Sequence, residues 1–201
     1  HPKDLSDELI AVMASRKNVC PHLHLPVQSG SDAILAAMNR KYTRAQYLRR
    51  VAALRAAMPH IGLSTDLIVG FPGETERDFA DTLSLCEEVR YDSAFTFIYS
   101  PREGTKAAAM DGRVQDDVAT ARIEKLIAAQ NAVTEEILTG MKGQTASVLC
   151  EGASKRSAKQ MTGKSERGVS VNFDGDAGDI GRIVTVTITG AGKSTLRAKK
   201  T

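Results

Sequence analysis

The first two thirds of the chain alternate between helical and strand-like spacing of apolar residues. Apolar side chains recur at helical spacing in five segments that we expect to be helices: residues 5–16, 32–38, 44–58, 76–89 and 118–138. Three intervening segments have the composition of strands: residues 22–26, 61–70 and 93–100. Alternating strands and helices favour parallel βαβ units, so this part is expected to adopt an α/β fold.

The spacing changes at Gly140. Four short runs rich in Val, Ile and Thr follow, separated by glycines, at residues 144–152, 168–175, 181–190 and 194–200. Short strands at this spacing are typical of a small all-β barrel. We therefore predict two units, residues 1–139 and residues 140–201.

Charge divides at the same place. Residues 1–139 hold 16 basic and 19 acidic residues, a net charge of −3, whereas residues 140–201 hold 11 and 5, a net charge of +6. A separate basic unit favours a polyanionic partner, although the charge could also serve only to keep a small domain soluble.

The composition argues against a membrane protein and against a metal site built from cysteines. No apolar run approaches the length of a membrane span, so no membrane partner is expected. Cys20, Cys86 and Cys150 are too far apart for a C-x-x-C metal pattern, which favours reduced thiols, a cytoplasmic location and no metal site in this chain.

The loop after the first predicted strand, in the segment "HLHLPVQSGSD", is rich in polar side chains. Ligands of parallel βα proteins bind at the carboxyl ends of strands. Gln28, Ser29 and Ser31 have the side chains to bond a ribose or a carboxylate, and Gly30 would allow a close backbone approach. The alternative is a plain helix cap before Asp32.

Two histidines in the same segment share one face of the strand. His22 and His24 are two residues apart, which would permit a metal pair. No pattern for a third ligand follows, so structural histidines are the favoured interpretation.

The second predicted strand carries a charge among apolar neighbours. Asp66 needs a partner or a ligand there, because an unpaired buried charge is costly; backbone donors are the alternative. Gly70 and Gly73 bracket Phe71-Pro72 in a tight turn, whose apolar wall suits an adenine ring.

The third predicted strand alternates aromatic residues. Phe95, Phe97 and Tyr99 share one face, where they could stack on a base or belong to the core, and we expect Phe95 to be core. Arg102 lies beyond the strand and could bind a phosphate or a carboxylate.

The basic unit has a cluster of cations followed by an amide and an aromatic ring. Its members are Lys155, Arg156, Lys159, Lys164, Arg167, Asn172 and Phe173. Cations that hold a phosphate backbone, beside a ring that stacks on a base, suit RNA. Alternatively, Phe173 belongs to the barrel core.

Five long segments together resemble one family. They read "HLHLPVQSGSD", "MNRKYTRAQYL", "STDLIVGFPGETERDF", "DSAFTFIYSPREGT" and "VNFDG". They are similar to the radical S-adenosylmethionine (SAM) tRNA methylthiotransferases, and the resemblance covers nearly the whole chain. It implies an α/β fold that is the C-terminal part of a TIM-like radical SAM barrel, followed by a small all-β TRAM barrel.

The resemblance also implies an activity. The nearest branch adds a methylthio group to N(6)-dimethylallyladenosine next to the anticodon, with SAM and 4Fe–4S clusters as cofactors and the tRNA anticodon stem-loop as partner. The C-x-x-x-C-x-x-C motif of the family is absent here, so we expect the cluster ligands in preceding sequence and assign no catalytic residue. The alternative is an RNA-binding module without catalytic activity of its own.

By this resemblance, three groups of residues receive roles. Those expected to bind the cofactor are Gln28, Ser29, Asp66, Gly70 and Phe71. Those expected to face the target nucleotide are Phe97, Tyr99 and Arg102. Those expected to contact the anticodon stem-loop are Lys155, Arg156, Lys164, Arg167 and Asn172.

Overall fold

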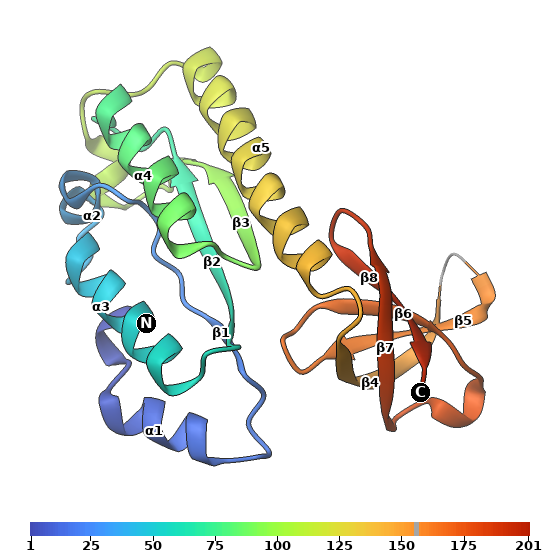
Figure 1. Cartoon of the computed structure of the whole chain (residues 1–201). Helices are drawn as coiled ribbons and strands as arrows, with labels where there is room; N and C mark the ends of the chain where they lie inside the picture. Colours follow the sequence, from blue (N-terminus) through green and yellow to red (C-terminus); the bar gives the residue numbers. More distant parts are fainter. Residues whose placement is uncertain (155–156) are drawn as a thin grey trace.

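The computed structural model describes residues 1–154 and 157–201, which form two units joined by one long helix (Figure 1). Lys155 and Arg156, both predicted RNA ligands, lie outside the described residues. The first unit contains η1 (Pro2–Asp4), α1 (Asp7–Ser15), β1 (His22–His24), α2 (Asp32–Ala37), α3 (Arg44–Ala57), β2 (Gly62–Val69), α4 (Glu76–Val89), β3 (Ser93–Ile98) and η2 (Lys106–Ala109). The long helix is α5 (Asp116–Gly140).

The three strands of the first unit form a parallel sheet in the order β1-β2-β3. Alternate residues of β2, such as Leu63 and Leu67, belong to one buried cluster with side chains of α3, α4 and α5. The helices thus cover one face of the sheet, and the predicted α/β fold is confirmed.

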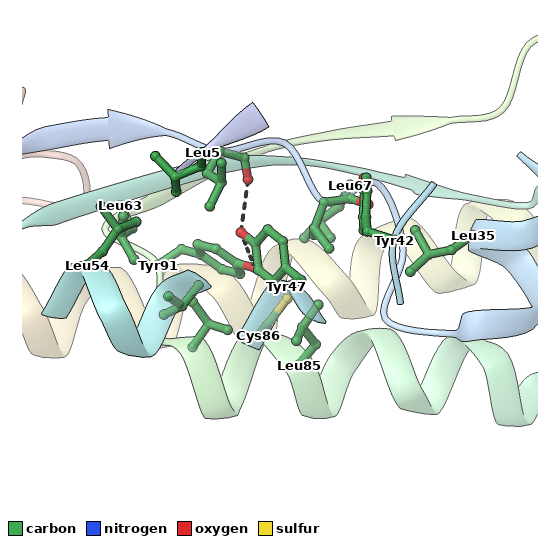
Figure 2. Packing of buried hydrophobic residues seen from close by; sticks show 14 of the residues in the cluster. Leu5, Leu35, Tyr42, Tyr47, Leu54, Leu63, Leu67, Leu85, Cys86 and Tyr91 are labelled. Atoms are coloured by element: carbon green, nitrogen blue, oxygen red, sulfur yellow. Dashed lines mark hydrogen bonds between the residues drawn. The ribbon is translucent and has the colours of Figure 1, made fainter. Parts of the chain in front are cut away.

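A hydrogen-bonded pair of tyrosines lies inside this cluster. The Tyr91 hydroxyl donates to the Tyr47 hydroxyl at 3.0 Å, and Tyr47 donates to the carbonyl of Leu25 at 2.9 Å (Figure 2). Both rings are fully buried, so the bonds satisfy polar atoms that burial would otherwise make costly.

The other face of the sheet is open. Phe95 on β3 is 59% exposed and Phe97 is 50% exposed. The prediction that Phe95 is a core residue is therefore wrong, because its side chain points away from the face that the helices cover. In the described part of the chain, the partner of its ring is His24, edge-on at 5.9 Å between centroids.

The second unit is a closed five-stranded barrel, as the spacing predicted. Its elements are β4 (Thr145–Ser154), β5 (Ser157–Ser165), β6 (Ser170–Asp174), η3 (Ala177–Asp179), β7 (Ile183–Ala191) and β8 (Thr195–Lys200). The strand order is β4-β5-β6-β8-β7, and β6 pairs with β8 in parallel. Val148, Val171 and Leu196 alternate into its core.

The long helix α5 contributes side chains to the cores of both units. Leu126, in the middle of the helix, packs in the core of the first unit, whereas Leu138 and Met141 pack in the barrel core. The helix ends at Gly140 and β4 begins at Thr145, so the predicted boundary between residues 139 and 140 lies at the last residue of the helix. Among the helices that the structure describes, none is long and apolar enough to span a bilayer.

Candidate functional site

A cavity of about 580 Å³ lies at the carboxyl ends of the three parallel strands. Five residues predicted from the sequence line it together: Gln28, Asp66, Phe97, Tyr99 and Arg102. They come from three segments that are far apart along the chain and that the sheet brings to one edge. The convergence of cofactor and substrate candidates at one opening is what strand-end binding requires.

Gln28 is held in position by two backbone hydrogen bonds to β2, beyond the end of β1. After Pro26, its backbone N–H donates to the carbonyl of Asp66 at 2.9 Å, and its own carbonyl accepts from Ile68 at 2.8 Å. Its φ of +76° is unusual for a residue with a side chain. This left-handed conformation turns the chain at the rim of the cavity.

Asp66 projects from the open face of β2 beside a row of polar side chains. Its carboxylate Oδ1 lies 3.4 Å from His24 Nε2, and His24 Nδ1 lies 3.0 Å from the Ser64 hydroxyl. His22 Nε2 lies 3.4 Å from the same hydroxyl. Burial lowers the pKa of His22, the largest of several effects there, which favours its neutral form. Hydrogen bonds through Ser64 therefore account for the two histidines.

Two buried polar atoms in the cavity wall have no hydrogen-bond partner among the described residues. They are the hydroxyl oxygen of Tyr99 and Nε of Arg40. Buried polar groups are nearly always satisfied, so unpaired ones that line a cavity favour a polar ligand. Arg40 was not predicted as a site residue. The turn at Asn39, with a φ of +58°, places it there, and no spacing in the sequence indicates this.

The turn after β2 supplies the wall behind the cavity. Phe71 is buried and packs edge-on against Tyr99, with 4.9 Å between ring centroids. The N–H of Gly70 donates to Glu74 Oε2 at 2.8 Å, and Arg122 of α5 donates to the same oxygen at 2.8 Å. Gly70 and Phe71 thus shape the site through the backbone and the buried ring.

Ser29 does not line the cavity. Its side chain is fully buried below α4, where its hydroxyl lies 3.3 Å from that of Thr82. The neighbouring Gly30 N–H also donates to Thr82, at 2.9 Å, and Ser31 caps α2 by accepting from Ile34. The loop therefore serves two purposes: Gln28 faces the cavity, while the residues after it anchor the loop to α4 and begin a helix.

The three cysteines do not fit an iron–sulfur cluster. Cys20 is exposed, Cys86 lies in the core of the first unit and Cys150 lies in the barrel core. Burial raises the pKa of the Cys86 thiol to about 12, so it stays protonated at neutral pH. Over residues 1–154 and 157–201, no three His, Cys, Asp or Glu side chains gather as a metal site would require.

Two of the predicted RNA ligands lie on the outer surface of the barrel. Asn172 on β6 pairs in register with Arg197 on β8, and Lys164 on β5 pairs with Ser170, to which its amine donates at 2.8 Å. Arg197 and Lys199 were not predicted as ligands, although their alternation with buried Leu196 and Ala198 shows that they face outward. Phe173 is fully buried, so the interpretation of it as barrel core is confirmed.

Arg167 has a different environment from the other barrel cations. Its guanidinium Nη2 lies 2.5 Å from Oδ1 of Asp92, which belongs to the first unit. Of the predicted RNA ligands that the structure describes, it is thus the one that already has a carboxylate partner.

Comparisons with known proteins agree with the two units. Residues 2–86 match the model of the radical SAM superfamily, and residues 140–201 match the TRAM domain. The chain is 49% identical over 98% of its length to the tRNA-2-methylthio-N(6)-dimethylallyladenosine synthase of Clostridium novyi, and 50% identical over 94% to that of Acetivibrio thermocellus. It covers 43% and 39% of those proteins.

A solved structure is similar in fold to about two thirds of the chain. The chain is similar to coproporphyrinogen III oxidase (HemN) from Escherichia coli, described as a radical SAM enzyme, with a TM-score of 0.56. The match covers 66% of this chain and 31% of that protein, at 18% identity. At this identity the likeness concerns the fold alone.

Proposed function

We propose that this chain, which belongs to the radical SAM tRNA methylthiotransferases, holds SAM and tRNA for the methylthiolation reaction. The chain spans about two fifths of the length of its curated relatives. The observation that carries the proposal is the convergence of Gln28, Asp66 and Tyr99 on one cavity at the strand ends. We propose the complete methylthiolation reaction for a protein of the relatives' full length, and we expect that protein to act in the cytoplasm.

The residues of the cavity fit an adenosyl ligand. The Asp66 carboxylate can accept hydrogen bonds from ribose hydroxyls, and the Gln28 amide can both donate and accept. The Tyr99 hydroxyl and Arg40 Nε, which have no partner among the described residues, can supply polar contacts to a ligand. When bound, SAM would supply radical chemistry on one-electron reduction by a 4Fe–4S cluster. The part of these residues would be to orient SAM and to limit access of water.

The rim of the cavity suits the target nucleotide. Phe97 presents an exposed ring that can stack on a base, and Arg102 presents a guanidinium that can pair with a phosphate. We assign the target to N(6)-dimethylallyladenosine beside the anticodon, by similarity to the relatives' named product. The apolar dimethylallyl group would find apolar surface at Phe97 and Ile98.

The barrel is proposed to bind the anticodon stem-loop. Its net charge of +6 and the outer positions of Lys164, Asn172 and Arg197 support contact with a phosphate backbone. The chain spans about two fifths of its relatives' length, and we propose that cluster binding belongs to the part of that length which it does not span. An RNA-binding module without catalytic activity of its own is the second candidate, and it predicts RNA binding without SAM binding.

The Asp66→Asn variant tests the cofactor site. A charged acceptor is worth about 1.5–3 kcal/mol, so the variant is expected to bind S-adenosylhomocysteine at least ~10-fold more weakly, measured by isothermal titration calorimetry. Asp111→Asn, at an exposed loop position outside the cavity, is the matched control. Equal affinities of the two variants, or no binding by the unmodified chain, would contradict the assignment.

The RNA half of the proposal has its own measurement. Anticodon stem-loop RNA is titrated into the unmodified chain at two salt concentrations, and affinity is expected to fall as salt rises. Binding that does not respond to salt would argue against the barrel as an RNA-binding unit. SAM binding without RNA binding would leave the cofactor site and remove the second candidate.

A further inference from the structure

The turn between β5 and β6 lies against the amino-terminal ends of the sheet strands. A Cβ added to Gly62, at the start of β2, would lie 2.8 Å from the carbonyl of Arg167. A Cβ added to Gly168 would lie 3.0 Å from the ring of His22, at the start of β1. Glycine on both sides therefore permits a close contact between the barrel and the sheet.

Asp92 is the acidic group at this contact. Its side chain is 8% exposed, and it accepts from the N–H of Leu63 through Oδ2 at 2.9 Å and from Arg167 through Oδ1 at 2.5 Å. Thr134 of α5 donates to its backbone carbonyl at 3.0 Å. One residue thus joins β2, the beginning of β3, α5 and the barrel.

The guanidinium of Arg167 is committed to this contact. Its side chain is only 22% exposed, compared with the fully outward Arg197 on β8. Moving this guanidinium away to a phosphate would leave the mostly buried Asp92 carboxylate without its cation, which is costly.

The barrel has a second and separate attachment. The last turn of α5 enters the barrel core through Leu138 and Met141, and α5 itself packs on β3 (Figure 1). The helix end fixes the barrel at one place. The contact of Arg167 with Asp92 is a second point of attachment, formed by the turn between β5 and β6.

We propose that Arg167 is an interdomain positioning residue, which fixes the barrel against the amino-terminal ends of β1, β2 and β3, and that it is not an RNA ligand. The inference goes beyond the proposed function, because it concerns how the two units are held together whether or not RNA binds. It also revises the role predicted for Arg167 from the sequence.

Hydrogen exchange of the full 201-residue chain tests the contact. In Arg167→Ala, amides at the start of β2, including that of Leu63, are expected to exchange at least ~10-fold faster, because local opening no longer breaks the ion pair. Arg197→Ala removes the same charge from an outward position of the barrel and is expected to leave these amides unchanged. Arg167→Lys, which keeps the charge, is expected to fall between the two.

The Asp92→Asn variant is a second test of the same ion pair, in case Arg167→Ala fails to fold. Asparagine keeps an acceptor for the Leu63 N–H but loses the charge, so it should speed exchange at the same amides. The double variant Arg167→Ala/Asp92→Asn should exchange no faster than the faster of the two single variants, since both changes remove one interaction. Additive acceleration, or unchanged exchange in Arg167→Ala, would overturn the proposal.

The salt dependence of RNA affinity separates positioning from direct contact. Arg197→Ala is expected to lower the slope of log affinity against log salt by about 1, and Arg167→Ala to leave it unchanged. A lower slope in Arg167→Ala with unchanged exchange would make Arg167 an RNA ligand. If the chain binds no RNA, the proposed function fails, and the exchange measurement still decides the role of Arg167.

Discussion

Gly30 illustrates how a single residue determines the position of a loop at the cavity. A Cβ at this position would lie 2.3 Å from the carbonyl of Asp81 and 2.6 Å from Cα of Thr82, both backbone atoms of α4. The sequence suggested that this glycine admits a ligand. In the structure, the absence of a side chain at Gly30 lets the backbone of α4 pack closely against the loop, and the Gly30 N–H donates to Thr82. The same contact holds Gln28 at the cavity.

The Gly30→Ala variant is therefore expected to be destabilised by roughly 3 kcal/mol, since the clash is with backbone that cannot rotate away. Urea unfolding followed by circular dichroism measures this. Gly140→Ala is the matched control: apart from its own helix and chain neighbours, no described atom lies within 4 Å of its added Cβ, and a stabilisation of at most about 1 kcal/mol is expected. Equal stabilities would mean that the loop moves away from α4 at little cost.

Individual site residues differ in how far the sequence could predict them. Gln28 and Asp66 were predictable because strand ends gather at one edge of a parallel sheet. Ser29 was not, because its direction depends on Thr82, which is 53 residues away in the chain. Arg167 was not, because its partner Asp92 belongs to another unit, 75 residues away. Local pattern carries no information on such partners.

At the scale of elements, a buried ion pair joins the turn after β2 to α5. Glu74 is fully buried in its side chain, Arg122 is nearly so, and their closest atoms are 2.8 Å apart. Burial raises the pKa of Glu74, although the Gly70 N–H and Arg122 oppose this. The pair is the point at which the long helix constrains the wall of the cavity.

Arg122→Met should destabilise the chain by about 3–5 kcal/mol, because it leaves a buried carboxylate without its cation. Adding Glu74→Gln to it should recover part of the loss, since a neutral amide still accepts from Gly70 and needs no cation. Chemical denaturation of the single and double variants compares them. Arg113→Met breaks an exposed pair with Asp116 and should have little effect. A double variant less stable than Arg122→Met alone would contradict this account.

Elements with local signals were predicted and one without them was missed. Thr43 and Thr75 begin α3 and α4 with capping boxes, and a threonine three residues before Gln46 or Asp78 is a local signal for a helix start. β5 was not predicted, because its inward positions are Met161, Gly163 and Ser165, which give no apolar alternation. Gly163 is required there by the barrel: a Cβ would lie 2.1 Å from the carbonyl of Leu149.

At the scale of the whole molecule, one face of the three-stranded sheet is not covered by any described helix. Phe95 and Phe97 are both exposed on this face. Adjacent exposed aromatic side chains favour association with another apolar surface. The sequence indicated which residues share this face, but which of the two faces the helices cover depends on tertiary packing.

Phe95→Gln is expected to shift the chain toward the monomer at concentrations where the unmodified chain associates, as measured by sedimentation velocity. Ile183→Gln removes an apolar side chain that is 73% exposed on the barrel, away from this face, and should not change the distribution. If both variants associate like the unmodified chain, the open face is not the contact surface.

The attachment of the barrel has a consequence for the length of RNA that can be used. The barrel meets the sheet at Gly62, where β2 begins, and the cavity lies toward the end of β2 at Val69, seven residues later, which corresponds to about 23 Å along the strand. A transcript that engages both units must extend over this separation. Oligonucleotides too short to do so would occupy one unit at a time and gain nothing from the other, so affinity should rise steeply at a threshold size.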